Sequence, residues 1–305
     1  MKLFDLHCDT ITELTLKKED LAYNDLAVSL EKGRLFEQWI QLYAIWMPDD
    51  LRGPQAVDYY EYAWAYFIHQ ADAVRDRFRI LQRKGLSDLP IGCPAGILAI
   101  EGGSAVCGSV ERLEKVYEDG VRLMTLTWNG ENELGYGISE DKGLKPAGRA
   151  VVKQMEALGM VVDVSHLAPA GFYDVAGMAS RPFVASHSNA KAICAHPRNL
   201  TDEQFKLIVQ SRGIVGLNFY KRFVKESALP PTMEDLIPHL DHFLSLGGED
   251  AVCIGSDFDG CDPVCGLSGL EDMESFFELV CSRYGNVLAD KFFFKNAYHF
   301  FKKYI

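Results

Sequence analysis

The chain has 305 residues, of which 48% are hydrophobic and 24% charged, a composition that excludes an intrinsically disordered protein. Its 31 lysines and arginines against 43 aspartates and glutamates give a net charge of −12, which disfavours binding to nucleic acid or to an anionic membrane surface. The N-terminal sequence MKLFDLHCDT does not have the pattern of a secretory signal, and no apolar run is long enough to predict a membrane span.

Short apolar runs recur along the chain and predict eight β-strands. Most of these runs are continuously apolar rather than alternating, as expected for strands that are buried on both faces. The predicted strands are residues 2–7, 38–46, 96–101, 121–128, 160–166, 182–187, 213–220 and 251–257.

Helical patterns separate these strands. They cover residues 54–84, 109–118, 146–158, 201–210 and 233–246, and several end at a glycine suited to a C-cap, namely Gly85, Gly120, Gly159 and Gly213. Alternating strands and helices predict a parallel sheet, and eight such units without a central break predict one closed (β/α)8 barrel of the TIM type over residues 1–305. The aromatic segment 292–305 is expected to be a helix packed on the body.

Polar residues stand where the predicted strands end. His7 and Asp9 end the first strand, and because residues two apart on a strand share a face, both can bind one ion. Four more predicted strands end in Glu101, His166, His187 and Asp257. In barrel enzymes the catalytic groups converge at this end of the strands.

Each of these residues alone is a weak signal, since a lone histidine at a strand end is more often a hydrogen-bonded structural residue. Together they favour a metal centre, because burying such groups without partners would cost about 1–3 kcal/mol each. Catalytic zinc sites and two-metal sites use histidine and carboxylate ligands of this kind. The fourth predicted strand has no lysine to bridge two metals, so Glu101 is the expected bridging carboxylate.

Other active-site classes lack support in the sequence. There is no GxSxG elbow, no phosphate-binding GxxxxGK[ST] loop and no GxGxxG turn. Ser165 and Ser186 precede histidines, but neighbours on a strand point in opposite directions, so no serine–histidine pair is expected. By the same argument Cys8 faces away from the ligands. The remaining histidines are expected at helix surfaces or in packing contacts (His69, His239, His242 and His299) or have no assigned role (His196).

A set of ordered motifs resembles the membrane dipeptidase (renal dipeptidase) family of metallopeptidases, within the amidohydrolase-like barrels. The matching segments run from Phe4 to about Gly269 and include DLHCDT, AIEGG, LTWNGEN, GLKPAGRAVVKQMEALGM, VDVSH, ASHSNAKAICAHPRNLTDEQ, GLNFY and IGSDFDG. As a series in this order, they are far more specific than any one of them.

The resemblance implies a role for each candidate residue. His7 and Asp9 look like ligands of a first zinc ion, His166 and His187 like ligands of a second, and Glu101 like the carboxylate between them. Asp257 matches the acid/base aspartate of the family. Arg198 matches the arginine that holds the carboxylate of the substrate, a task that suits the bidentate guanidinium.

The chain departs from the family pattern at Trp128. Members with the mammalian pattern carry there a histidine that helps to polarise the scissile carbonyl. Tryptophan offers only an indole N–H, so Asn129, Asn132 or the metals alone are the candidates to replace that histidine.

The implied function is hydrolysis of dipeptides by a hydroxide that bridges two zinc ions, with Asp257 as general base and then acid. The family allows a D-residue at the C-terminal position and suggests a homodimer, and the ligands also suit other divalent ions. Loops 47–53 and 129–145 are expected to select the substrate. The alternatives are a metal-dependent amidohydrolase acting on N-acyl amino acids or lactams and a non-catalytic barrel that binds small molecules. The eight cysteines include no CxxC pair, so a reduced, cytoplasmic protein is expected.

Overall fold

A parallel sheet of eight strands forms the centre of the molecule, in a computed structural model that describes residues 1–81 and 85–305. The strands follow the order β6-β5-β4-β2-β1-β8-β7, and a short strand β3 pairs with β4. Their bounds are Lys2–Cys8 (β1), Gln38–Trp46 (β2), Arg79–Ile80 (β3), Ala95–Glu101 (β4), Val121–Thr125 (β5), Val161–Asp163 (β6), Val215–Leu217 (β7) and Val252–Ile254 (β8).

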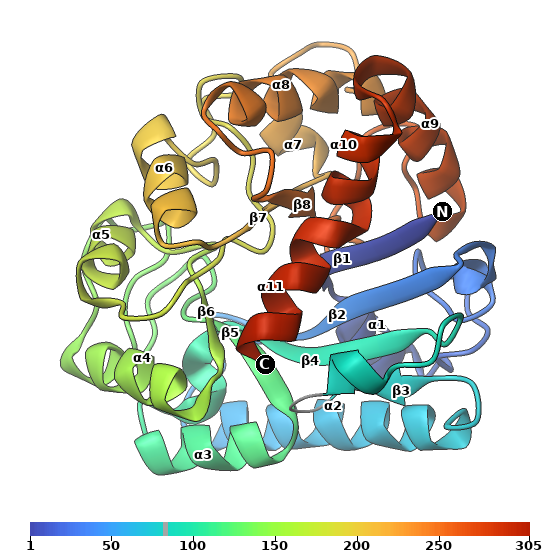
Figure 1. Ribbon diagram of the computed structural model, residues 1–305. Coiled ribbons are helices and arrows are strands. Elements are labelled where there is room, and N and C mark those ends of the chain that lie inside the picture. The colour runs from blue at the N-terminus through green and yellow to red at the C-terminus, as the bar shows by residue number, and fades with distance from the viewer. Residues whose placement is uncertain (82–84) are drawn as a thin grey trace.

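The sheet curls into a barrel, which confirms the predicted TIM-type fold (Figure 1). Its closing segment is the predicted strand 182–187, and here the prediction is wrong in detail. The segment forms no regular strand and is joined to its neighbours by two isolated parallel bridges, Asp163 to Val184 and Ala185 to Val215. The reason is that the Asp163 carboxylate accepts the Ser186 N–H at 3.0 Å, a donor that a regular ladder would give to a neighbouring strand.

Helices surround the barrel and connect its strands (Figure 1). The α-helices are Thr10–Lys17 (α1), Pro54–Ala73 (α2), Val110–Glu118 (α3), Pro146–Leu158 (α4), Pro169–Met178 (α5), Asp202–Gln210 (α6), Lys221–Val224 (α7), Ile237–Ser245 (α8), Met273–Tyr284 (α9), Asn286–Asp290 (α10) and Asn296–Tyr304 (α11). Short 3-10 helices span Lys32–Leu35 (η1), Gly85–Asp88 (η2), Gly103–Val106 (η3), Met233–Leu236 (η4) and Leu270–Asp272 (η5), and a π-helix spans Lys291–Lys295 (η6). Within the described residues, no helix has the length and apolarity that a membrane crossing requires.

The helix predicted over residues 54–84 ends earlier than expected, at Ala73. Phe78 is buried in the core and the next two residues pair with β4, so the chain must leave the helix before that point. Residues 82–84 lie outside the described residues, and Gly85 begins a 3-10 helix instead of capping an α-helix. After α6 the left-handed position expected at Gly213 is taken by Arg212, with φ of 66°.

Two apolar layers hold the barrel together, as the continuous apolar runs predict. Inward-facing side chains such as Leu42 and Ile97 form one cluster, and outward-facing ones such as Tyr43 and Leu98 pack under the helices. The C-terminal segment covers the end where the strands begin, where Phe301 stacks on Phe4 with ring centroids 5.2 Å apart (Figure 1). The opposite end, where the strands finish, therefore remains open to solvent.

Two departures from regular strand geometry shape that open end. On β1, Asp5 pairs with Gln41 but Cys8 pairs with Tyr43, so β1 carries one extra residue between them. This bulge lets Leu6 pack inside the barrel while the next residue, His7, also reaches the open end. In the second half of the chain, β6, β7 and β8 stop about three residues before their predicted ends, and the residues that follow form the loops at the barrel mouth.

Candidate metal centre

The strand ends bring the six predicted ligand and acid/base residues into one buried cluster. His7, Asp9, Glu101, His166, His187 and Asp257 are each at most 8% exposed. Their ligand atoms form three groups of mutually close atoms: His7 with Asp9 and Glu101, Glu101 with His166 and His187, and His7 with His187 and Asp257. Each predicted member of the cluster therefore lies next to at least two others.

Glu101 lies between the first two groups. One of its carboxylate oxygens, Oε1, lies 2.7 Å from Nε2 of His166 and 3.4 Å from Nε2 of His187. The other, Oε2, lies 3.8 Å from Nε2 of His7, which is itself 3.4 Å from Oδ2 of Asp9. The two oxygens thus face two different sets of ligands, which is the geometry that a carboxylate between two cations requires.

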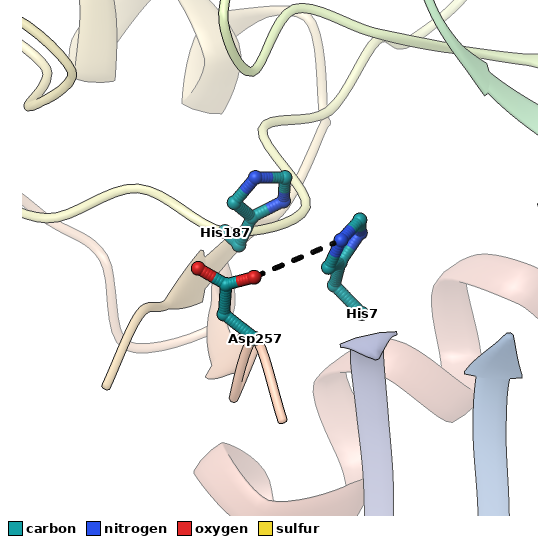
Figure 2. A group of neighbouring side chains, drawn as sticks. All are labelled: His7, His187 and Asp257. Atoms are coloured by element: carbon teal, nitrogen blue, oxygen red, sulfur yellow. Dashed lines mark ion pairs between the residues drawn. The ribbon is translucent and has the colours of Figure 1, made fainter. Parts of the chain in front are cut away.

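Asp257 forms the third side of the cluster. Figure 2 shows its carboxylate facing both His7 and His187, with Oδ1 3.9 Å from Nε2 of His7. Its other oxygen, Oδ2, accepts a hydrogen bond of 3.0 Å from the Asn218 side chain, which follows β7. One oxygen of Asp257 is therefore held in place while the other faces the ligand atoms.

The local backbone is bent to aim these side chains. His166 and Asp257 both adopt left-handed conformations, with φ of 68° and 64°, which are uncommon for non-glycine residues. Gly260 approaches so closely that a Cβ there would overlap Oδ2 of Asp9. Asp9 stands at the N-cap of α1 without capping it, because its carboxylate is turned toward the cluster.

Hydrogen bonds from outside the cluster orient two of the histidines. Nδ1 of His166 lies 2.9 Å from Oδ1 of Asn129, and Nδ1 of His187 lies 2.8 Å from Oγ of Ser186. The contact of His187 with Ser186 corrects the expectation that adjacent residues point apart. It forms because the segment is not a regular strand and because Ser186 also donates to Asp163 at 2.5 Å. The hydroxyl lies on the Nδ1 side, away from the cluster, so it orients the ring and does not act as a nucleophile.

Burial and the neighbouring charges shift the pKa of His7 in opposite directions, and burial also shifts the pKa values of other residues in the cluster. Burial raises the pKa of Glu101 well above its usual value and lowers those of His166 and His187 well below theirs. Burial alone would also lower the pKa of His7, but Asp9, Glu101 and Asp257 outweigh it and raise the value to about 10. Two histidines are thus neutral with free lone pairs, while the carboxylates need positive charge nearby.

The residues present fit a divalent cation. Both ring nitrogens of His7 and Oδ1 of Asp9 are buried and have no hydrogen-bond partner among the described residues. Neutral imidazole nitrogens and carboxylate oxygens are zinc ligands, and cations would replace the protons that the buried carboxylates otherwise need. The donor set and its burial are therefore those of a metal centre.

A cavity of about 720 Å³ opens above the cluster at the mouth of the barrel. Arg198 lies in its wall, and at 5% exposure the side chain is almost fully buried. Its Nη2 donates to the His187 carbonyl at 3.3 Å, whereas Nε has no partner among the described residues. Burial lowers the pKa of Arg198 to about 10, so the guanidinium stays charged and free to pair with an anion.

Trp128 also lines the cavity, edge-on to Trp46 with ring centroids 5.1 Å apart. The structure separates the two asparagines that the sequence offered in place of a histidine there. The Asn132 side chain makes its hydrogen bonds within its own loop: it donates to the carbonyl of Leu126 and accepts from two backbone N–H groups. Asn129 contacts His166 and therefore orients a ligand.

Sequence reasoning missed several residues around the centre. Asp163, Ser186 and Asn218 hold ligand or acid/base residues in position, and Arg222 and His196 line the cavity. Asp163 carried a usable signal, because a charged residue within an apolar strand must be paired or hydrogen-bonded. Arg222 lies on the four-residue helix α7 and the others in loops or in the irregular closing segment, where the sequence gives no indication of which way a side chain points.

Comparisons with known proteins agree with this geometry. The model of the family "Membrane dipeptidase (Peptidase family M19)" matches residues 1–303. A crystal structure of a metallopeptidase from Rhodobacter sphaeroides, liganded with a phosphinate mimic of the dipeptide L-Ala-D-Ala, superposes with a TM-score of 0.92 at 27% identity, covering 100% of this chain and 99% of that one.

Two relatives of known sequence extend the comparison. The "Uncharacterized protein in pqqA 5′ region" of Klebsiella pneumoniae is 37% identical over 218 residues, which cover 66% of this chain and 79% of that protein. An uncharacterized dipeptidase of Schizosaccharomyces pombe is 34% identical over 190 residues, covering 61% of this chain and 46% of that one. The resemblance seen in the sequence motifs is thereby confirmed. The chain belongs to the membrane dipeptidase family, peptidase family M19, and is a metal-dependent peptidase.

Proposed function

We propose that the chain is a binuclear zinc dipeptidase whose ligands are the five residues His7, Asp9, Glu101, His166 and His187. The observation that carries this proposal is the position of Glu101, whose two oxygens face two separate sets of ligand atoms. The first set, His7 and Asp9, would hold one cation, and the second, His166 and His187, the other. The ligand types admit other divalent ions as well.

The metals, when bound, would polarise the scissile carbonyl and lower the pKa of the attacking water. The side chains of this chain then have three tasks. Asp257 accepts the proton of the water at Oδ1, which faces the cluster, and returns it to the amine that leaves. Asn218 keeps that carboxylate aimed by its hydrogen bond to Oδ2. Arg198 pairs with the C-terminal carboxylate of the substrate and so places the peptide bond over the cluster.

The free C-terminus required by Arg198 supports short peptides as substrates. The Rhodobacter sphaeroides metallopeptidase binds a mimic of L-Ala-D-Ala, and on that likeness we propose that a D-residue is accepted at the C-terminal position.

The test combines metal content with a substrate panel. We expect about two zinc ions per chain, cleavage of dipeptides, and loss of that activity after complete chelation with recovery on adding zinc. N-acyl amino acids and a β-lactam belong in the same panel. Cleavage of these compounds in preference to dipeptides would favour the alternative amidohydrolase, and full activity after complete metal removal would contradict the proposal.

The variant Asp257→Asn tests the proton transfer. It preserves the shape and the Asn218 contact but removes the base, so we expect a loss of at least about 100-fold in kcat with metal content retained. Asp262→Asn is the matched control, because Asp262 lines the same cavity but lies on its exposed rim, paired with Lys221. Equal losses in both variants would argue against a specific role for Asp257.

A further inference from the structure

The cavity wall beside Arg198 carries a second arginine that the dipeptidase mechanism does not use. Arg222 lies on the short helix α7 and lines the cavity. Its guanidinium makes no hydrogen bond or ion pair with any described residue, whereas the side chain of the preceding residue, Lys221, does. Lys221 pairs with Asp262 at 3.1 Å, so this acid of the cavity lining already has a cationic partner. An arginine directed at a substrate cavity without a partner is suited to an anion brought by the substrate.

Arg222 belongs to the same wall as Arg198. Phe223, the residue after Arg222, has its ring centroid 5.4 Å from Cζ of Arg198 and 4.5 Å from the ring of His196. Burial lowers the pKa of His196, and Arg198 and Arg222 both lower it further, as expected if both charges are close to that ring. The two arginines thus present positive charge to one end of a bound substrate.

The positive charge of this wall contrasts with acidic side chains elsewhere in the cavity lining. The chain has a net charge of −12, and carboxylates of Glu13, Asp259 and Asp262 also line the cavity. An acidic substrate side chain would be repelled by these carboxylates and attracted to the wall formed by Arg198 and Arg222.

We propose that the enzyme prefers dipeptides whose C-terminal residue is acidic, aspartate or glutamate, and that Arg222 recognises the side-chain carboxylate of that residue. The inference rests on the proposed function, because Arg198 must hold the main-chain carboxylate of the same residue. The C-terminal residue of the substrate would then pair with both arginines: its main-chain carboxylate with the buried Arg198 and its side-chain carboxylate with the exposed Arg222.

The decisive comparison uses substrates that differ only in charge. Ala-Glu and Ala-Gln have nearly the same shape, and each is tested with an L- and a D-configured second residue. We expect kcat/KM for the glutamate dipeptide to exceed that for the glutamine dipeptide by about tenfold in the native enzyme. Because Arg222 is exposed, this ratio should fall as salt is raised.

Variants then assign the preference to one residue. Arg222→Gln should reduce the ratio to about one, mainly through the KM of Ala-Glu, while hydrolysis of Ala-Ala changes less than about threefold. Lys221→Gln is the matched control: it removes the same charge from the adjacent residue of the same helix, but Lys221 does not line the cavity. Arg222→Glu should reverse the preference toward Ala-Lys.

Binding measurements keep this inference separable from the proposed function. The affinities of phosphinate mimics of Ala-Glu and Ala-Gln, measured by calorimetry, give the same ratio without turnover. Binding that favours the glutamate mimic through Arg222 supports the inference even if no dipeptide is cleaved. A ratio near one in the native protein, or one that Arg222→Gln leaves unchanged, would overturn it even if dipeptides are cleaved rapidly.

Discussion

At the scale of single residues, the candidate metal centre depends on side chains that hold the ligand residues in position. From the sequence, Asn129 and Asn132 are equal candidates to replace the histidine missing at position 128. In the structure they hydrogen-bond to different groups. Asn129 contacts a ring nitrogen of His166, whereas Asn132 stabilises the backbone of its loop. Substitution of Asn129 should therefore affect metal binding, whereas substitution of Asn132 should affect the stability of the fold.

We therefore predict opposite results for two alanine variants. Asn129→Ala should weaken zinc binding about tenfold, because His166 loses the partner that fixes its orientation, with little change in Tm. Asn132→Ala should lower the stability by about 2 kcal/mol, because two buried N–H groups lose their acceptor. Zinc titration with a competing chelator and thermal unfolding of the apo-protein measure the two effects. Equal effects of both variants on zinc affinity would contradict the assignment.

At the scale of elements, His239 on α8 joins the two segments that carry Arg198 and Arg222. Its Nδ1 accepts the N–H of Ala190 at 3.1 Å, and its Nε2 donates to the carbonyl of Val224 at 2.8 Å. The first contact lies at the start of the loop that leads to Arg198, and the second at the end of α7. Only the neutral ring can make both contacts, because a protonated Nδ1 would face the Ala190 N–H donor-to-donor.

Because only the neutral ring makes both contacts, the contribution of His239 to the free energy of unfolding depends on pH. Burial lowers the pKa of His239 to about 4, whereas an unfolded histidine titrates at about 6.5. The unfolded state therefore binds the proton first as pH falls, so the contribution is complete above about pH 6.5 and is lost toward pH 4. At pH 5 the expected loss is about 2 kcal/mol.

Urea unfolding at pH 7 and pH 5 measures this effect. His239→Gln should lower the stability at pH 7 but reduce the further loss on going to pH 5 by about 2 kcal/mol relative to the native chain. His299→Gln, on the exposed side of α11, should leave the native pH dependence in place. An unchanged pH dependence in His239→Gln would show that the imidazole is not the titrating group.

At the scale of the whole molecule, the barrel is closed by a carboxylate where regular strand pairing is missing. Asp163 accepts hydrogen bonds from the Thr125 hydroxyl, from the backbone N–H groups of Ser165 and Ser186, and from the Ser186 hydroxyl. These donors come from β5, from the chain after β6 and from the closing segment. One buried side chain thus connects three neighbouring parts of the barrel wall.

We predict that Asp163→Ala destabilises the fold by on the order of 4 kcal/mol, because its buried donors lose their acceptor. Asp163→Asn should cost less, since the amide oxygen still accepts the backbone donors. Asp290→Ala, which removes only an exposed ion pair with Lys295, is the control and should cause no measurable change. Urea unfolding gives all three values, and a loss for Asp163→Ala no larger than for the control would exclude a role in closure.

The sequence by itself determined the fold class, the end of the barrel that carries the polar residues, and the identity of the six residues that cluster there. It could do so because apolar periodicity marks strands, and because parallel strands of a closed barrel all finish at one end. His7 and Glu101 were placed at strand ends from this pattern alone, as the structure has them, whereas Asp257 lies three residues beyond the end of β8.

Only the tertiary structure decided how those residues are held and what surrounds them. The bulge on β1, the left-handed backbone at His166 and the irregular segment before His187 break the alternation on which sequence reasoning depends. The partners Asn129, Ser186 and Asn218 lie in loops or irregular segments. Loop side chains have no periodicity, and their directions are set by packing against segments distant in the sequence. Arg222 lies on the four-residue helix α7, and its place at the cavity wall is likewise set by packing against segments distant in the sequence.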